Sequence, residues 1–364
     1  RDAHTSRRLR RVIGAVNMDI CGRPDKAPRM KDSNPGTVSF SPGGVGRNIA
    51  HNLCLLDIDV KFIAAIGDDV YGDSVYESCV RLGMDMHLSR RMSGGRTSSY
   101  LYVTDENGDM LVGVNDTDIS ASITPEYLKA HIKEINAADA VVIDANLTRE
   151  TVAWIAENVP ARLYADPVSA AKAERLRPAL SKLTAFKPNE FEAKSMTNET
   201  TSLFAAEALL REGVKKVFVS LGSDGIVAAE GSEIIKLPCE TTEIVNCTGC
   251  GDAATAAIIW AGVNGLGITG SQITPPRRVP GRSFVACISV PPIHRSIWKM
   301  YTALCAKYGA SCDSSEKILH YISAEFSYQL ISSGQSSGFI APGHAAHIAA
   351  AFMAADALSA MPSP

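Results

Sequence analysis

The stretch VNCTGCGDAATA, from Val245 to Ala256, decides the interpretation of this chain. The strand-like segment TTEIV (241–245) leads into it, and DAATAAIIWAG (252–262) continues it with the small, apolar residues of a helix. Two glycines stand at the join between them. The stretch therefore predicts a strand, a tight turn and a helix in direct succession.

Gly249, Cys250 and Gly251 would form the first turn of that helix, where unpaired main-chain N–H groups point outward and the helix dipole favours negative charge. Glycine lets the backbone approach an anion closely, and phosphates use such helix N-termini. A carboxylate at Asp252 would lie directly beside this anion hole. The arrangement suits phosphoryl transfer, in which the amides hold the moving group and Asp252 accepts the proton of the attacking hydroxyl.

Two plainer interpretations stay open for this stretch on its own. An acidic residue in the first turn also occurs in an ordinary helix cap. Cys247 and Cys250 have the C-x-x-C spacing of redox and zinc sites, although no second pair accompanies them. The choice depends on the rest of the chain.

The composition favours a cytoplasmic protein. The chain has 364 residues, enough for one large domain or two smaller ones, and a net charge of −3. This balance gives no reason to expect a nucleic-acid or membrane partner. Nine scattered cysteines suit a reduced, cytoplasmic setting, and no run of 18 apolar residues suggests a membrane span.

Short apolar runs that end in polar or glycine residues alternate with helical patterns. The first run, RRVIGAVNMDI (10–20), reads as a strand that ends at Asn17 and Asp19. Further runs are DAVVIDAN (139–146) and KKVFVSLGSDG (215–225), and TRETVAWIAENV (148–159) is one of the helices between them. This alternation predicts an α/β fold with a doubly wound, mostly parallel sheet, whose ligands bind beyond the carboxyl ends of the strands. Alternating segments at about 20–42 and 95–118 predict a small β lid that stands off this sheet.

The domain organisation follows from changes in composition. Residues 1–10 form a basic tail, and residues 11–266 carry the α/β pattern. Residues 267–364 begin with an irregular Pro-, Gly- and Arg-rich linker and continue with stretches that suit helices. We therefore expect one main domain followed by a divergent C-terminal region.

Four motifs, in order and in spacing, resemble those of the PfkB (ribokinase-like) carbohydrate kinases. They are SPGGVGRNIAHNLCLLDIDVKFIAAIGDDVYGD (41–73), KPNEFEA (187–193), VSLGSDG (219–225) and VNCTGCGDAATAA (245–257). The resemblance covers about residues 10–266 and implies a ribokinase-like fold, ATP and Mg²⁺. In many members K⁺ also binds, in elements that cannot be recognised after Leu266. An altered reading frame, an unusual splice product or a divergent extension would each explain that departure.

Within the family, two stretches are similar to those of pseudouridine kinases: DENGDMLVGVNDTDISASITPEYL (105–128) and YADPVSAAKAERLR (164–177). The resemblance implies transfer of the ATP γ-phosphate to the 5′-hydroxyl of pseudouridine, with no nucleic-acid or membrane partner and with a homodimer formed through the lid. Kinases of another ribosyl nucleoside or of a free sugar are the alternative within the family. A catalytically weak nucleoside-binding protein is the alternative outside it, because the C-terminal region diverges.

Site residues follow from the motifs and from local chemistry. Glycines allow a sugar ring to lie against the backbone, and Asp116 would read the free N1–H of a C-linked uracil. Lys187 is interpreted as structural, and Asp166 would line the phosphate side. The catalytic set is Asp252, Gly249, Cys250 and Gly251; the substrate-binding set is Asn17, Asp19, Gly43, Gly44, Asn48, Thr97, Ser99, Asn115 and Asp116; the ATP-binding set is Asn189, Ser220, Gly222, Gly225 and Thr248; and Asn189 with Glu192 would hold Mg²⁺ through water.

Overall fold

The computed structural model describes residues 10–56, 58–106, 108–238 and 249–265, together with the backbone of 272–277 and 285–289. The chain divides into two compact units. The first comprises Arg1–Arg277 and Phe284–Ile288, and it contains all the elements below apart from the last residue of the final strand. The second comprises Arg278–Ser283 and Ser289–Pro364, and apart from Ser289 it lies outside the described residues. The boundaries expected from composition therefore stay predictions.

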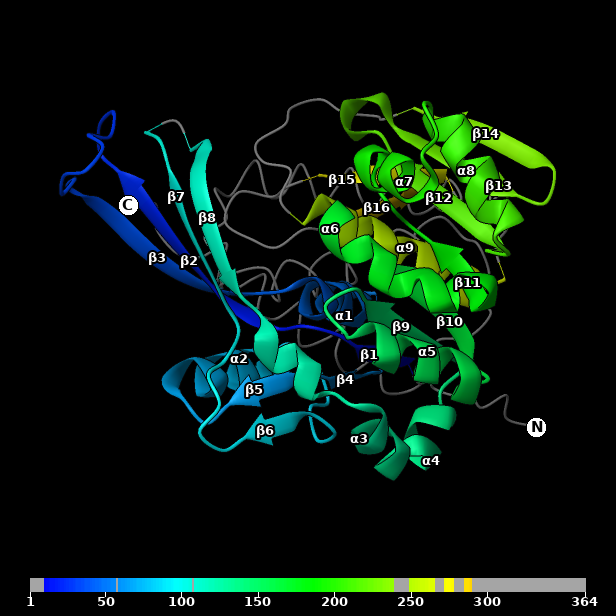
Figure 1. Ribbon diagram of the computed structural model, residues 1–364, viewed down its shortest axis with the longest axis horizontal. Helices are drawn as coiled ribbons and strands as arrows, with labels where there is room; N and C mark the ends of the chain where they lie inside the picture. The colour runs from blue at the N-terminus through cyan, green and yellow to red at the C-terminus, as the bar shows by residue number, and fades with distance from the viewer. Residues whose placement is uncertain are drawn as a thin grey trace, which may run out of the picture. The chain divides into compact units, whose positions relative to one another are not determined.

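An eight-stranded sheet forms the centre of the first unit (Figure 1). Its order is β14-β13-β12-β11-β10-β9-β1-β4, and all neighbours from β12 to β4 are parallel. The last two pairs, at the β14 edge, are antiparallel. The strands are β1 (Arg10–Ile13), β4 (Val60–Ile63), β9 (Ala140–Asp144), β10 (Arg162–Asp166), β11 (Leu183–Phe186), β12 (Lys216–Ser220), β13 (Ile226–Glu230) and β14 (Glu233–Leu237).

Helices cover both faces of this sheet, which confirms the doubly wound α/β class. The first three lie in order along the chain as α1 (Val45–Leu55), α2 (Val70–Arg81) and α3 (Pro125–Ala130). The others are α4 (Ile132–Asn136), α5 (Arg149–Asn158), α6 (Ala170–Ala173), α7 (Glu190–Thr197), α8 (Ser202–Arg211) and α9 (Cys250–Val263), with short 3₁₀ segments η1 (Asp118–Ser122), η2 (Glu174–Lys182) and η3 (Gly222–Asp224).

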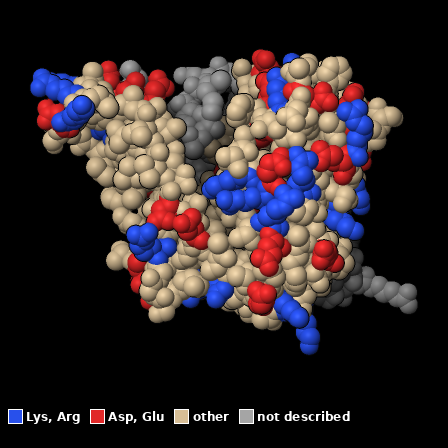
Figure 2. Space-filling model, viewed as in Figure 1, with Lys and Arg blue, Asp and Glu red and all other residues tan. Residues whose placement is uncertain are grey.

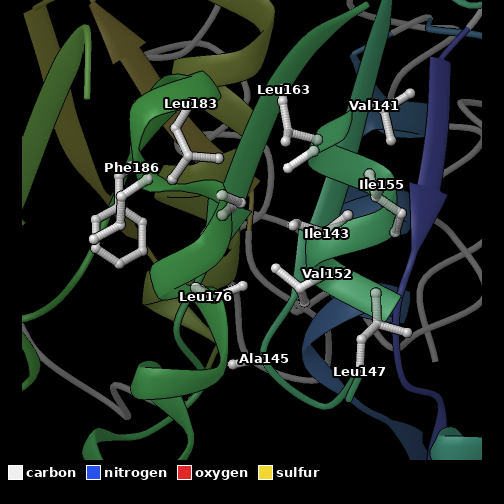
Figure 3. Packing of buried hydrophobic residues seen from close by; sticks show 14 of the residues in the cluster. Val141, Ile143, Ala145, Leu147, Val152, Ile155, Leu163, Leu176, Leu183 and Phe186 are labelled. Atoms are coloured by element: carbon white, nitrogen blue, oxygen red, sulfur yellow. The ribbon is translucent and has the colours of Figure 1, made fainter. Parts of the chain in front are cut away.

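The core is split in two by the sheet because neighbouring strand residues point to opposite faces. In β9, Val141 and Ile143 pack with α5, η2 and α8, whereas Ala140 and Val142 pack with α1, α2 and α9. Figure 3 shows the first of these layers, in which Val152 and Ile155 of α5 and Leu176 of η2 meet the strand side chains. Burial on both faces explains why the strands read as continuous apolar runs.

A second sheet of four strands forms the lid, in the order β3-β2-β7-β8. Its strands are β2 (Asn17–Pro24), β3 (Gly36–Gly43), β7 (Ser99–Thr104) and β8 (Met110–Asp116). The pairs β2–β3 and β7–β8 are antiparallel, and β2 and β7 are parallel. The lid is confirmed, and its blue and cyan ribbons are seen in Figure 1.

Two small sheets complete the described elements. β5 (Ala65–Gly67) pairs in parallel with β6 (Arg90–Met92), and β15 (Gln272–Arg277) pairs with β16 (Val285–Ser289). Among the described residues, the helices are all too short or too polar to cross a membrane.

The first apolar run differs from the sequence interpretation, which treats RRVIGAVNMDI as one strand ending at Asn17 and Asp19. The structure divides it: β1 ends at Ile13, and Asn17 opens the lid strand β2. The division occurs where Gly14 passes so close to the Asp144 carboxylate that a Cβ atom would have no room. The chain leaves the main sheet there, so Asn17 and Asp19 lie at the root of the lid.

Candidate active site

A cavity of about 350 Å³ opens at the carboxyl edge of the main sheet. The carboxyl ends of parallel strands meet at one edge, which is where open α/β sheets bind ligands. The residues that follow β10, β11 and β12 line the cavity together with the first turns of α7 and α9. The lining consists of Val45, Asp166, Val168, Lys187, Asn189, Glu192, Ser220, Gly222, Gly225, Ile226, Cys250, Gly251, Asp252 and Ala254.

The N-terminus of α9 has the geometry expected of an anion hole. Gly249 is the N-cap residue with φ 78°, a left-handed conformation that favours glycine. The first helical bond runs from the N–H of Ala253 to the carbonyl of Gly249 at 3.0 Å. The N–H groups of Cys250, Gly251 and Asp252 therefore lie before that bond, in the positions that a helix leaves without an intrahelical partner.

Asp252 lies in the first turn of α9 and is 9% exposed. Its Oδ2 accepts a hydrogen bond from Asn48 Nδ2 at 2.8 Å. The pKa of Asp252 is raised to about 7, first by burial and then by the charge of Asp166, while the Asn48 bond and the Lys187 ammonium offset part of the rise. A carboxyl whose pKa lies near neutral pH is suited to exchange a proton with a substrate.

A buried cation lies beside the anion hole. Lys187 follows β11 and is 5% exposed, and its Nζ is 3.5 Å from Asp166 Oδ2. A Cβ atom on Gly251 would lie 3.3 Å from that ammonium, so Lys187 reaches the first turn of α9. Thr255 Oγ1, one turn into the helix, donates to the same Asp166 oxygen at 2.8 Å.

The sequence analysis gave Lys187 a structural role only, and it named Asp166 without a partner. The position of Lys187, directly before Pro188 and the Asn189 motif, was the available signal. A parallel strand that ends in a polar residue at the edge of the sheet places that residue among the ligands. Which of these side chains turn inward depends on packing.

Asn189 and Glu192 form a capping box at the start of α7. Asn189 Oδ1 accepts from the N–H of Glu192 at 2.8 Å, and Glu192 Oε2 accepts from the N–H of Asn189 at 2.8 Å. Both residues line the cavity, and burial raises the pKa of Glu192. Each acceptor group keeps lone pairs beyond the capping bond, so the pair fits a Mg²⁺ ion held through water.

The loop after β12 supplies the remaining expected ATP residues. Ser220 ends β12, and its N–H donates to the carbonyl of Pro188 at 3.0 Å. Gly222 and Gly225 bracket η3 with φ values of 62° and 96°. These three line the cavity, whereas Thr248 and Cys247 lie outside the described residues.

Five of the expected substrate residues meet at the root of the lid. Asn17 Nδ2 donates to Asp19 Oδ1, and Asn17 is the register partner of Gly43 in the β2–β3 pair. A Cβ atom on Gly43 would lie 2.2 Å from Asp19 Oδ2, and Gly44 has φ 100°. Burial raises the pKa of Asp19 to about 6, while Asn17 and Arg47 lower it. Asn48 joins this group to Asp252.

None of the nine expected substrate residues is among those that line the cavity. Thr97 Oγ1 donates to Asp69 Oδ1 at 2.6 Å and accepts from the N–H of Gly67 at 2.9 Å, so it joins the lid to the turn before α2. Asp116 Oδ2 accepts from Arg96 Nη2 at 3.0 Å and lies opposite Ser99. Asn115 is exposed on β8, opposite Tyr100.

Comparisons with known proteins agree with this arrangement. Residues 9–271 match the family described as pfkB family carbohydrate kinase. A pseudouridine kinase of Escherichia coli (strain K12) is 37% identical over 265 residues, covering 70% of this chain and 84% of the relative. A ribokinase of Bacillus subtilis (strain 168) is 29% identical over 267 residues, covering 71% and 86%.

The fold of this chain is also similar to that of a solved kinase structure. The crystal structure of a ribokinase from Thermotoga maritima matches with a TM-score of 0.65 at 23% identity, covering 71% of this chain and 87% of that one. The fold is therefore ribokinase-like. Because the family match extends over most of the chain, the chain belongs to the PfkB family of carbohydrate kinases, phosphotransferases that act on a hydroxyl group.

Proposed function

We propose that this protein is an ATP-dependent kinase that transfers the γ-phosphate to the 5′-hydroxyl of pseudouridine, giving pseudouridine 5′-phosphate and ADP. The observation that carries the proposal is the contact of Asn48, at the root of the lid, with Asp252 beside the anion hole. This hydrogen bond connects the polar residues that would hold the sugar with the main-chain N–H groups that would hold the phosphoryl group. A nucleoside held by the first would present its hydroxyl to the second.

Asp252 is the general base of this proposal. Its carboxylate accepts the proton of the 5′-hydroxyl as the bond from oxygen to phosphorus forms, and a pKa of about 7 places it near the working pH. The N–H groups of Cys250 and Gly251, with the capping residue Gly249, hold the negative charge of the moving phosphoryl group. The Lys187 ammonium adds a positive charge at the same place.

ATP and Mg²⁺ are expected for ribokinase-like kinases, and the residues that line the cavity support both. The nucleotide would lie along Ser220, Gly222, Gly225 and Thr248, the residue before Gly249. Asn189 and Glu192 would hold Mg²⁺ through water. When bound, Mg²⁺ neutralises phosphate charge and keeps several of its waters. A requirement for K⁺ stays a prediction of the family resemblance.

At the other end, Asn17, Asp19, Gly43, Gly44 and Asn48 would contact the ribose hydroxyls. Two glycines leave space where a side chain would meet Asp19 or the main chain of Val16, and the carboxylate and amides supply donors and acceptors. Asp116, with Asn115, Thr97 and Ser99, would contact the base from the lid. Turnover of Asp116→Ala on pseudouridine and on ribose tests this, because a base contact predicts the larger loss on pseudouridine.

The choice of pseudouridine rests on the similarity to the Escherichia coli pseudouridine kinase, which exceeds that to the ribokinase. A kinase for another ribosyl nucleoside or a free sugar is the alternative that the ribokinase similarity favours. A weak nucleoside-binding protein is a further alternative, because the sequence of residues 267–364 departs from the family pattern.

The lid also supports the expected homodimer. In Figure 2 charged residues gather at the outer tip of the lid, whereas the part of the lid below that tip is mostly free of them on the side shown. Its exposed apolar side chains include Val38, Phe40, Leu101, Met110, Leu111, Val112 and Val114. The strand register places Val38, Phe40, Leu101, Val112 and Val114 on one face. An exposed apolar face of this kind is typical of an interaction site, and a second lid is the proposed partner. Sedimentation equilibrium of Val114→Asp against wild type tests it, with a shift toward monomer expected.

An ADP-release assay over pseudouridine, uridine, guanosine and ribose tests the reaction. Wild type should turn over pseudouridine with the highest kcat/KM, and Asp252→Asn should release ADP only at background. A higher kcat/KM for ribose or another nucleoside would replace the substrate and keep the kinase. Nucleoside binding without turnover would favour the binding protein.

A further inference from the structure

Asp144, the last residue of β9, joins three segments of the fold. It is 1% exposed. Its Oδ2 accepts from the N–H groups of Ala15, after β1, and Gly46, in the first turn of α1, at 2.9 Å each. Its Oδ1 accepts from the N–H of Asn146 at 2.9 Å. A buried carboxylate needs such donors, and here main-chain groups of β1, α1 and β9 supply them.

The surrounding backbone is shaped around this carboxylate. A Cβ atom on Gly14 would lie 2.4 Å from Asp144 Oδ2, and one on Gly46 would lie 2.9 Å from it and 3.0 Å from the main chain of Gly14. Neither glycine is among those with positive φ. Glycine is therefore required at both positions because a Cβ atom would not fit, and not because the backbone conformation excludes other residues.

The first turn of α1 also carries Asn48, which contacts Asp252, the proposed general base. The N–H of Asn48 donates to the carbonyl of Gly44 at 2.9 Å, which holds the residue in the helix. Arg47 Nη1 donates to Asn48 Oδ1 at 3.1 Å, so the other end of the amide, Nδ2, is directed to Asp252 Oδ2 at 2.8 Å. The place of the α1 N-terminus therefore sets where this amide meets Asp252.

We propose that Asp144 is a positioning residue for phosphoryl transfer: its carboxylate holds the N-terminus of α1 against the ends of β1 and β9 and so places Asn48 against Asp252. Asp144 is not among the residues that line the cavity, and it acts through Asn48. The inference rests on the proposed function, in which Asp252 is the base. Misplacing a group by about 1 Å can cost about 10²-fold in rate, so kcat/KM of Asp144→Asn should fall by about that factor.

The simpler alternative is that Asp144 acts only as a fixed negative charge. The two ideas predict opposite changes in the pKa of Asp252. Asp166 and Asp144 raise this pKa by their charge, whereas the Asn48 bond and Lys187 lower it, and the Asn48 bond outweighs Asp144. The Arg47 guanidinium also faces Asp252. Loss of the Asp144 charge alone lowers the pKa of Asp252, while displacement of Asn48 raises it.

Titration of the Asp252 carboxyl by ¹³C NMR, in full-length protein labelled at aspartate Cγ, separates the two ideas. The Asp252 signal is identified by its absence in Asp252→Asn. Asp144→Asn should raise the pKa of Asp252, as Asn48→Ala does, and the double variant should show no further rise. This readout needs no turnover, so a wrong substrate would leave it unaffected and would appear only in the kinetic assay.

Asp139→Asn is the matched control, because Asp139 lies at the opposite end of β9, where it pairs with Arg10 at 2.9 Å. In Asp139→Asn, the pKa of Asp252 should equal the pKa of Asp252 in wild type. A lowered or unchanged pKa in Asp144→Asn would overturn the proposal. If that variant does not fold, Gly46→Ala replaces it, since alanine favours a helix but its Cβ would crowd Asp144. A raised pKa of Asp252 there supports the proposal, and an unchanged one overturns it.

Discussion

Asn48 Nδ2 lies 2.8 Å from Asp252 Oδ2, although 204 positions of sequence separate the two residues. Asn48 belongs to the first helix, next to the lid, and Asp252 belongs to the anion hole of the last described helix. The bond therefore connects the two motifs that the sequence places at opposite ends of the domain. The predictions below test what each side of this contact does.

Asp252→Asn should lower kcat by about 10²–10⁴-fold, because the amide cannot accept the hydroxyl proton. The KM for ATP should change little, since the main-chain amides remain. Steady-state kinetics measure both constants. Asp73→Asn, which changes an exposed acidic residue in the first turn of α2, is the control and should behave as wild type. Near-normal kcat in Asp252→Asn would remove the base assignment.

The pH dependence follows from the raised pKa of Asp252, which is about 7. The base works when ionised, so kcat/KM should fall as pH drops through this value, by about tenfold per pH unit well below it. Asn48→Ala removes a bond that favours the ionised form, so its acid limb should move to higher pH. A profile that stays flat from pH 8 to about 5 would contradict this.

Lys187→Met should weaken binding of the non-hydrolysable ATP analogue AMP-PNP more than binding of ADP. The ammonium faces the anion hole, where the third phosphate would lie, and an ion-paired group of this kind contributes more than a neutral one. Isothermal titration calorimetry with Mg²⁺ measures both affinities. Lys194→Met, on the exposed face of α7, is the control. Equal losses for the two nucleotides would leave Lys187 with a structural role only.

Gly43→Ala should raise the KM for the nucleoside by about tenfold, because crowding of this kind costs about 1–3 kcal/mol. The added Cβ would lie 2.2 Å from Asp19 Oδ2 and would push that carboxylate aside. The KM for ATP should stay close to that of wild type. Gly22→Ala, farther along the lid, leaves 3.8 Å to its nearest neighbour and should be neutral.

Thr97→Val should reduce the free energy of unfolding by about 1–3 kcal/mol, because the buried N–H of Gly67 would lose its acceptor. Urea denaturation measures the change, and Thr37→Val on the exposed strand β3 is the control. The KM for pseudouridine distinguishes this structural role from the substrate contact expected from sequence. An increase in that KM with unchanged stability would favour the substrate contact.

Much of the fold could be predicted from the sequence because its signals are local. Alternating apolar runs and helical patterns predicted the doubly wound sheet, and the alternating segments at about 20–42 and 95–118 predicted the lid. The first run was wrongly taken as one strand. A single glycine does not mark the change of sheet at Gly14, and the close approach of Gly14 to Asp144 exists only in the folded chain.

The sequence by itself determined which chemistry this protein can perform: the glycines around Cys250, the carboxylate after them and the order of the motifs are all local features. The tertiary structure alone decided which distant side chains serve that chemistry. Lys187 and Asp166 face the same cavity as Asp252, and Asp144 holds the helix that brings Asn48 to it. The reason is physical. Backbone conformation follows from neighbouring residues, whereas the burial, pKa and partners of a side chain depend on chain segments that meet only after folding.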